Sequence, residues 1–329
     1  MKERPLISII TTTYNHGNFI GRCIESVLAQ TYPHWEQIII DDGSIDNTND
    51  VVSQYKDGRI KYVRQNNVGI WRLNETYNRA LQYSQGELIA ILEGDDFWPT
   101  YKLEKQLIAF EKKEVVLSFG KAAITDRKGR TIMVIPKNLK RFRNKSKEEL
   151  LKKLLFENFI PACTVMCRKD VLVSIGGFKQ PKNIPLVDYP TWLELALYGI
   201  FSPIDEILGY WRQHEKQVTR TMITGECRPI KYAIDFFNQM PQELKKSIKI
   251  NYNDLLLNHQ YLVASVSFDF GRKDLTESKW AEAKKNFKEA INKGSLSTKT
   301  KAILGLICSH CRIDLEWAST ILNRPRLNK

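Results

Sequence analysis

The segment LIAILEGDD (residues 88–96) joins a short, wholly apolar run to carboxylates at Glu93, Asp95 and Asp96. An unbroken apolar run that ends in a turn is typical of a strand buried on both faces of a parallel sheet. Carboxylates this close together repel one another unless a cation or an array of donors compensates for their charge. The segment therefore predicts a buried strand whose end faces a ligand.

Two earlier segments have the same form. LISII (residues 6–10) runs into the polar turn TTTYNHG, and QIII (residues 37–40) runs into DDGS. Strands that alternate with helices predict a parallel α/β sheet with right-handed crossovers, in which ligands bind beyond the carboxyl ends of the strands. We therefore expect the three polar ends to converge. The other elements expected in this region are a helix that carries Ile20, Ile24, Val27 and Leu28, a helix over 46–55, a strand over 60–63 and a helix over 74–84.

The chain has 329 residues, enough for two domains. Strand signals end near residue 220, and the remainder is helical in pattern. Asp274 and Glu277 have the spacing of a capping box ahead of an apolar helical face, and Gly294 is a natural stop. We predict an α/β domain over 1–220 and a helical C-terminal region over 221–329, available for contact with an acceptor, a membrane or a second subunit.

Positive charge dominates the composition, with a formal net charge of +13. Such an excess favours anionic partners, such as nucleic acid or a membrane surface, although a solvated surface explains it equally well. No apolar stretch reaches the roughly 20 residues of a membrane-spanning helix. We expect a cytoplasmic protein with peripheral contact at the inner, anionic face of the membrane. The densest basic residues are Lys137, Lys140, Arg141, Arg143, Lys145, Lys147, Lys152 and Lys153.

Several motifs occur in one order along residues 5–220, and together they resemble family 2 glycosyltransferases. The resemblance implies the GT-A fold, a Rossmann-like, mostly parallel sheet flanked by helices. It also implies inverting, metal-dependent transfer of a sugar from a nucleoside-diphosphate sugar, with a UDP-sugar favoured. The motifs are SIITTTYN (8–15), IDDGS (40–44), NNVG (66–69), EGDD (93–96), GGF (176–178), DY (188–189) and YWRQH (210–214).

The resemblance also implies a donor site. Tyr14 offers a ring face to the base, and Asp42 accepts from a base N–H while Asp41 serves the turn. The other residues expected to contact the donor are Thr12, Asn67, Asn78, Glu93, Asp95, Arg212 and His214.

The resemblance also implies the ligands of a metal ion and the catalytic base. Asp96 is the expected direct ligand of Mn²⁺ or Mg²⁺, with Asp95 beside it, because hard divalent ions take carboxylate oxygens. Glu93 stands where the family more often has aspartate. Asp188 matches the aspartate that deprotonates the acceptor in inverting relatives. Val187 replaces the glutamate that usually precedes that base, which removes one like charge that would raise the pKa of Asp188.

The resemblance also implies a glycan acceptor, linked to a lipid, in the synthesis of capsule, O-antigen or exopolysaccharide. Two alternatives remain open. A catalytically silent relative would bind the donor without turnover, and the departures at Glu93 and Val187 are compatible with it. A basic nucleic-acid-binding protein would need aromatic side chains interleaved with its positive charge as a stacking platform, and the basic segment does not provide one. We therefore expect no nucleic-acid partner.

Overall fold

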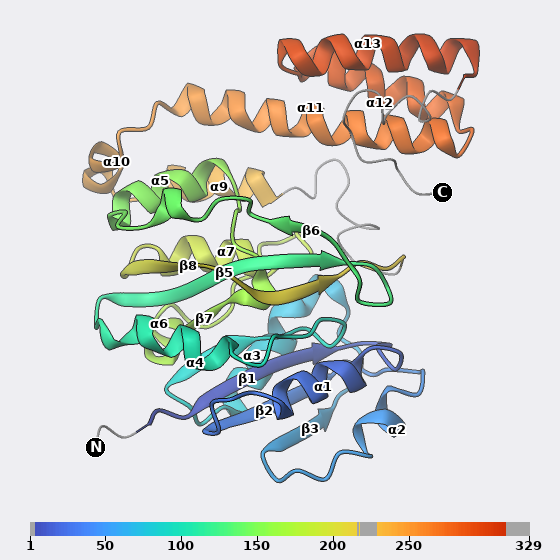
Figure 1. Cartoon of the computed structure of the whole chain (residues 1–329). Coiled ribbons are helices and arrows are strands. Elements are labelled where there is room, and N and C mark those ends of the chain that lie inside the picture. Colours follow the sequence, from blue (N-terminus) through green and yellow to red (C-terminus); the bar gives the residue numbers. More distant parts are fainter. Residues whose placement is uncertain (1–3, 216, 218–228, 314–329) are drawn as a thin grey trace. The chain divides into compact units, whose positions relative to one another are not determined.

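The chain folds into two compact units, Met1–Ile248 and Lys249–Lys329. The computed structural model describes residues 4–215, 217 and 229–313 (Figure 1). The domain boundary predicted at residue 220 lies outside the described residues. Two helices beyond it, α9 (Pro229–Gln239) and α10 (Gln242–Ile248), belong to the first unit.

One eight-stranded sheet organises the first unit. Its strands follow the order β3-β2-β1-β4-β7-β5-β6, with β8 beside β5. The neighbours among β3, β2, β1 and β4 are parallel, and β7 pairs with its neighbours antiparallel. The predicted α/β fold with a mostly parallel sheet is confirmed. The strands are β1 (Ile7–Thr13), β2 (Trp35–Asp41), β3 (Ile60–Arg64), β4 (Leu88–Ile91), β5 (Val115–Thr125), β6 (Thr131–Ile135), β7 (Met166–Arg168) and β8 (Ile200–Arg212).

The polar ends of β1, β2 and β4 meet, as the sequence predicts. Every residue of β1 is buried, because the strand lies between β2 and β4. The carbonyl of Thr12 accepts from the backbone N–H of Gly94 (2.9 Å), and the carbonyl of Thr13 accepts from that of Asp42 (2.9 Å). The end of β1 is therefore bonded to the turns after both neighbouring strands.

Helices cover the sheet of the first unit (Figure 1). The buried stripe of α1 consists of Ile20, Cys23, Ile24 and Val27, and it joins the core formed with β1, β2 and β4. Besides α9 and α10, the α-helices are α1 (Ile20–Leu28), α2 (Thr48–Val52), α3 (Leu73–Tyr83), α4 (Lys102–Leu107), α5 (Lys147–Phe156), α6 (Lys169–Ser174) and α7 (Asp188–Leu195), and short 3₁₀ turns span Ile70–Arg72, Ile108–Glu111, Lys140–Phe142 and Ala162–Thr164.

The second unit contains α11 (Tyr252–Thr276), α12 (Trp280–Lys293) and α13 (Leu296–Cys311). Phe287 is fully buried, and a Cβ on either Gly271 or Gly305 would lie within 3 Å of its ring. The predicted capping box is wrong, because α11 continues through Asp274, whose carboxylate accepts from Nδ2 of Asn286 (2.7 Å). No described helix combines the length and apolar character needed to cross a membrane.

Candidate active site

A cavity of about 1190 Å³ lies in the first unit, where the turns after β1, β2 and β4 meet. Sites for one small molecule usually enclose 300–1,000 Å³, so this cavity has room for more than one substrate group. Asn78 and Arg212 are not among its lining residues. The predicted site residues that line it are Thr12, Tyr14, Asp42, Asn67, Glu93, Asp95, Asp96, Asp188 and His214.

Tyr14 and Asp42 stand at the β1–β2 side of the cavity. The Tyr14 side chain is 45% exposed, so a ring face is free to stack. The carboxylate of Asp42 accepts from the backbone N–H groups of Val68 (2.9 Å) and Gly69 (3.1 Å) and from Nε2 of Gln65 (2.7 Å). A carboxylate has about four lone-pair sites, so Asp42 supports the loop and retains one site for a ligand.

The two aspartates at the end of β2, Asp41 and Asp42, have different surroundings. Asp41 is fully buried and accepts from the backbone N–H of Ser44 (2.8 Å) and the hydroxyl of Tyr62 (2.5 Å).

The turn residue after Asp42 is Gly43, which has φ +77°, and a Cβ there would lie 2.8 Å from the backbone nitrogen of Asn67. The loop that carries Asn67 can therefore pass this close only because residue 43 is glycine.

Gly94 allows the acidic loop after β4 to pack against the end of β1. A Cβ at this position would lie 2.7 Å from Oγ1 of Thr13 and 3.0 Å from Nδ1 of His16. Side-chain carbon at residue 94 would therefore push away the loop that holds His16. The glycine in EGDD brings the carboxylates of β4 and the imidazole of the β1 loop into one place.

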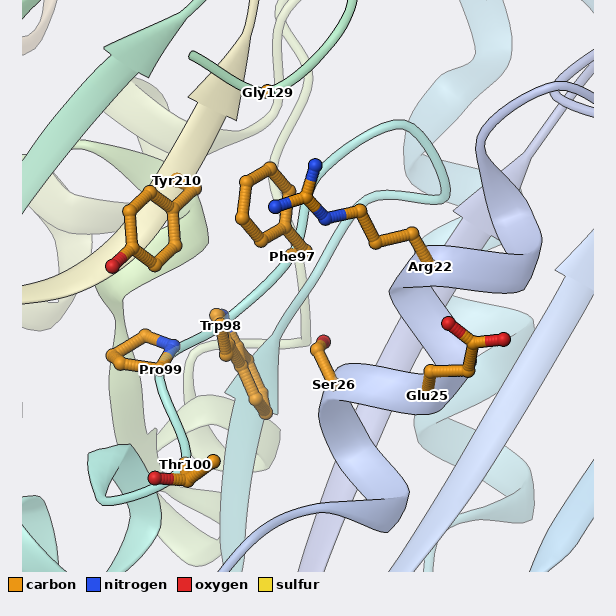
Figure 2. Close-up of a pocket in the computed structure, with 9 residues that line it drawn as sticks. All are labelled: Arg22, Glu25, Ser26, Phe97, Trp98, Pro99, Thr100, Gly129 and Tyr210. Atoms are coloured by element: carbon orange, nitrogen blue, oxygen red, sulfur yellow. The ribbon is translucent and has the colours of Figure 1, made fainter. Parts of the chain in front are cut away.

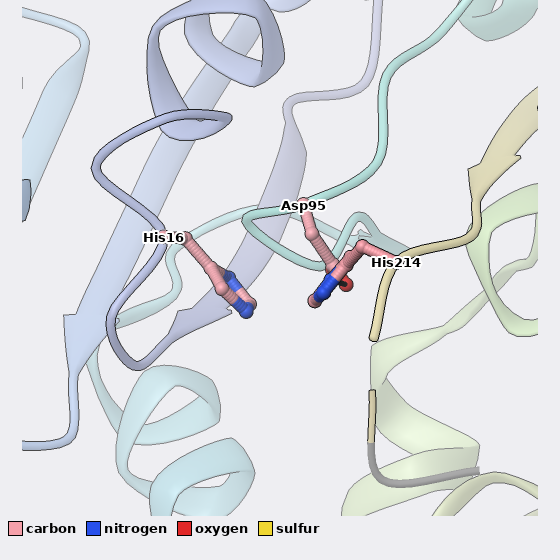
Figure 3. A group of neighbouring side chains, drawn as sticks. All are labelled: His16, Asp95 and His214. Carbon is pink, nitrogen blue, oxygen red and sulfur yellow. Dashed lines mark hydrogen bonds and ion pairs between the residues drawn. The ribbon is translucent and has the colours of Figure 1, made fainter. Parts of the chain in front are cut away.

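His16, Asp95 and His214 form a compact group (Figure 3). One ligand atom from each lies within 4.8 Å of the other two, and Nε2 of His214 is 3.0 Å from Oδ2 of Asp95. The ring centroids of the two histidines are 6.1 Å apart. Among the described residues, this is the group of histidine, cysteine and acidic side chains spaced to hold a metal ion. Sequence reasoning did not single out His16, although its position after β1 was a usable signal.

Burial and charge set the protonation of this group. Burial lowers the pKa of His16 against the opposing charge of Asp95, which favours the neutral ring. Burial alone would raise the pKa of Asp95, but His16 and His214 outweigh it and the net pKa lies below the usual range. A neutral imidazole and an ionised carboxylate are the forms that ligate metals.

Asp96 has a different orientation from Asp95. Its Oδ1 accepts from the backbone N–H of Arg212 (2.9 Å), and the residue is only 4% exposed. Burial, followed by the charges of Asp95 and Glu93, raises the pKa of Asp96 well above its usual range. The expectation that Asp96 is the direct metal ligand stays a prediction, and the geometry favours Asp95 for that role.

Two predicted donor residues point elsewhere. The guanidinium of Arg212 lies 4.8 Å from the ring centroid of Phe19 and 5.2 Å from that of Phe97. Asn78 uses both polar atoms of its side chain on the backbone of Phe178, at 2.8 and 3.0 Å. The structure therefore gives Asn78 a connecting role between α3 and the GGF segment.

A second cavity of about 490 Å³ lies beside the residue that follows Asp96 (Figure 2). Phe97 stacks on Tyr210 with ring centroids 4.5 Å apart, and the guanidinium of Arg22 lies 3.7 Å from the centroid of Phe97. Backbone hydrogen bonds also join Phe97 and Tyr210 in both directions (2.8 and 3.3 Å). These contacts attach the acidic loop to β8.

Glu93 lines the main cavity, as does Tyr77. The hydroxyl of Tyr77 donates to Oε1 of Glu93 (2.8 Å), whereas Oε2 is buried with no hydrogen-bond partner among the described residues. Burial raises the pKa of Glu93 to about 7, and the charges of Asp95 and Asp188 add to the shift against the hydrogen bond from Tyr77. Glu93 therefore holds a proton for part of the time near neutral pH.

Asp188 is the first residue of α7. Its Oδ2 accepts from Nδ2 of Asn158 (3.2 Å), and its Oδ1 is buried without a partner in the part of the chain that the structure describes. Burial raises the pKa of Asp188. A buried carboxylate oxygen with a raised pKa at a cavity wall has the properties of a general base.

Parallel strands that end together at one cavity define a Rossmann-like α/β enzyme with its site at the carboxyl edge of the sheet. Within that class, the model of the family described as "Glycosyl transferase family 2" matches residues 8–175. This is just over half of the chain, which belongs to that family and is a glycosyltransferase.

Two relatives illustrate the family. The chain is 33% identical over 215 residues to TuaG of Bacillus subtilis, a glycosyltransferase named for teichuronic acid biosynthesis, which covers 64% of this chain and 79% of that protein. It is 31% identical over 203 residues to WfgD of Escherichia coli, named a UDP-Glc:alpha-D-GlcNAc-diphosphoundecaprenol beta-1,3-glucosyltransferase, which covers 61% of this chain and 73% of that protein.

Two solved structures share the fold. S. aureus TarS (residues 1–349, in complex with UDP-GlcNAc) gives a TM-score of 0.61 at 17% identity and covers 97% of this chain and 92% of that one. The mannosyltransferase PcManGT from Pyrobaculum calidifontis, in complex with GDP-Man and Mn²⁺, gives 0.57 at 14% identity and covers 94% and 87%. At these identities the likeness establishes the GT-A fold.

Proposed function

We propose that this glycosyltransferase moves a sugar from a UDP-sugar to a hydroxyl of a lipid-linked glycan, with inversion at the anomeric carbon and with the help of Mn²⁺ or Mg²⁺. One observation carries the proposal. A single cavity holds Asp42 beside an open aromatic face, the group formed by Asp95 and His214, and the buried carboxylate of Asp188. In this proposal Asp42 and the aromatic face bind the nucleoside, the group with Asp95 and His214 serves the diphosphate, and Asp188 is the base.

The nucleoside end is formed by Tyr14, Asp42 and the loop at Asn67. The exposed ring of Tyr14 stacks on the base, and the remaining lone pair of Asp42 accepts from a ring N–H of uracil. Thr12 lies at the same end of β1 and lines the cavity toward the ribose. The UDP-glucose in the name of the Escherichia coli relative supports uridine as the nucleoside.

The residues present fit a divalent ion, because Nδ1 of His16 is buried without a hydrogen-bond partner in the described part of the chain. Asp95 and His214 would hold the ion, with Asp96 as the further carboxylate that the sequence predicts. When bound, a divalent ion neutralises the charge that develops on the departing diphosphate. The Mn²⁺ named with the mannosyltransferase structure supports this cofactor.

Asp188 is the proposed base. Its unpartnered Oδ1 takes the proton of the acceptor hydroxyl, whose oxygen forms a bond to the anomeric carbon. The bond between that carbon and the diphosphate oxygen breaks on the opposite side, and the pair of electrons leaves with UDP. Attack opposite to the leaving group inverts the configuration. Asn158 keeps the other carboxylate oxygen of Asp188 in position.

The proposed acceptor is a lipid-linked glycan. The volume of about 1190 Å³ leaves space beside a donor, and the diphosphoundecaprenol-linked sugar in the relative's name supports a lipid-linked acceptor. We further propose that residues 1–220 carry the transfer chemistry and that the helical C-terminal region serves acceptor, membrane or subunit contact. The basic segment around α5 is suited to an anionic membrane surface.

The test is transfer of labelled sugar from UDP-glucose, UDP-GlcNAc and GDP-mannose to lipid-linked monosaccharide acceptors. We expect one UDP-sugar to be used, transfer to stop after EDTA treatment and to return with Mn²⁺, and the product to have the opposite anomeric configuration by NMR. Transfer at the full rate in a metal-free preparation would contradict the metal dependence. Donor binding without any turnover would identify a catalytically silent relative instead.

A further inference from the structure

The β1 loop brings an additional histidine to the cavity. His16 comes from the segment after β1, Asp95 from the loop after β4, and His214 from the chain just beyond β8, and Figure 3 shows the three side chains directed toward one another. Three elements that are distant in sequence therefore supply one ligand atom each, all within 4.8 Å.

The spacing fits a single ion. Two ligands of one small divalent ion, each at roughly 2.1 Å, lie at most about 4.2 Å apart, so a small rotation of the side chains closes the group. His16 packs closely against Gly94, since a Cβ at residue 94 would lie 3.0 Å from Nδ1 of His16. The glycine therefore allows His16 to approach Asp95. Nδ1 of His16 is also buried without a hydrogen-bond partner among the described residues, so this ring nitrogen is free to bind an ion.

The kind of ligand decides the kind of ion. Carboxylate and water suit both Mg²⁺ and Mn²⁺, but Mn²⁺ is a first-row transition ion and also tolerates imidazole nitrogen, whereas Mg²⁺ keeps to oxygen ligands. Two imidazoles and one carboxylate therefore favour Mn²⁺ over Mg²⁺. Three protein ligands also allow the ion to bind before any diphosphate is present, in contrast to Mg²⁺ sites built on one or two carboxylates plus substrate phosphates.

We propose that His16 is a third protein ligand of the divalent ion, together with Asp95 and His214, and that it gives the site its preference for Mn²⁺ and its ability to bind the ion without donor. The proposal rests on the metal dependence proposed above, and it assigns to His16 a role that the motifs alone do not indicate.

The experiment measures free Mn²⁺ by electron paramagnetic resonance during titration of the full chain without donor. We expect one Mn²⁺ per chain, not displaced by a hundredfold excess of Mg²⁺, and an affinity at least about tenfold weaker in His16→Gln. His16→Glu keeps a ligand of the harder kind, so it should recover Mn²⁺ binding while losing the preference over Mg²⁺. The matched control is His34→Gln, an exposed histidine on the far side of α1 in sequence, with the affinity of the unmodified chain.

Unchanged Mn²⁺ affinity and Mg²⁺ competition in His16→Gln would overturn the proposal, as would equal weakening in His16→Gln and His16→Glu. Thermal unfolding without metal shows whether each variant is folded, and His16→Glu answers the question where His16→Gln is not. The outcome is separate from the proposed function. Transfer that needs Mn²⁺ in an enzyme whose His16→Gln variant binds Mn²⁺ normally would reject this ligand alone, whereas metal-free transfer would reject the metal dependence itself.

Discussion

Nε2 of His214 lies 3.0 Å from Oδ2 of Asp95, although 119 residues separate the two in the chain. The contact depends on β8, which runs beside β5 and ends just before His214. It also depends on the paired backbone hydrogen bonds between Phe97 and Tyr210, which join the acidic loop to β8. The contact is therefore a product of strand pairing in the first unit.

Replacement of His214 by alanine should reduce transfer by at least about tenfold. Together with the larger effect of His16, the hydrogen bond and the electrostatic interaction with His214 keep the pKa of Asp95 low. The change removes both of these, and it removes one candidate ligand of the ion. The measurement is kcat/KM for the donor at several Mn²⁺ concentrations. His310→Ala, at an exposed histidine of α13, is the control with unchanged kcat/KM. A His214→Ala enzyme that matched this control would contradict the assignment.

Gly94→Ala should damage both stability and the site. The new methyl group would meet Thr13 at 2.7–2.9 Å and Nδ1 of His16 at 3.0 Å, and overpacking of this kind costs about 1–3 kcal/mol of unfolding free energy. Urea unfolding and Mn²⁺ titration check the two effects. Gly58→Ala is the matched control, because a Cβ there meets no atom within 4 Å. Equal stability of the two variants would show that the close approach at Gly94 is not needed.

Much of the first unit was predictable from local pattern. The apolar runs that became β1, β2 and β4 have few alternatives to a buried parallel strand, so their positions and their converging ends were predicted correctly. The strand β8 was not predicted. Pro203 interrupts its sequence, and the exposure of its residues does not alternate, so it carries no strand signal of its own. Pairing with β5 makes it a strand, and no local pattern contains that pairing.

The side-chain roles were less predictable than the residues. The sequence placed Asp95 and Asp96 at the end of β4, but the turn decides that Asp95 meets His214 while Asp96 accepts from the backbone of Arg212. Asn78 looked like a donor contact, and its amide is instead used by Phe178, a residue distant in sequence. Each outcome depends on a tertiary contact that the motif itself does not encode.

Tyr14 offers a clean test of base stacking. Tyr14→Ala should weaken the binding of UDP by about 5–150-fold, because stacking of one base on an aromatic ring contributes about 1–3 kcal/mol. Tyr14→Phe keeps the ring and should bind UDP as the unmodified enzyme does. Isothermal titration with UDP and Mn²⁺ measures both. Equal losses in the two variants would assign the effect to the hydroxyl, and no loss in Tyr14→Ala would place the base elsewhere in the cavity.

Glu93→Gln should stabilise the protein at high pH. Burial raises the pKa of Glu93 to about 7 in the folded chain, against about 4.3 for an unperturbed glutamate. The folded state therefore binds more protons than the unfolded state between these values, so this group's contribution to stability is present at pH 4 and is lost as the pH rises through 7. Glutamine removes the titration and still accepts from Tyr77 through Oε1. The unfolding free energy of the variant should exceed that of the unmodified protein by on the order of 2–3 kcal/mol at pH 8, with little difference at pH 4.

Glu243→Gln, at an exposed glutamate of α10, is the control for this prediction and should change stability little at either pH. The opposite outcome is a Glu93→Gln variant whose unfolding free energy at pH 8 is lower than that of the unmodified protein. It would show that the ionised carboxylate stabilises the fold through a partner.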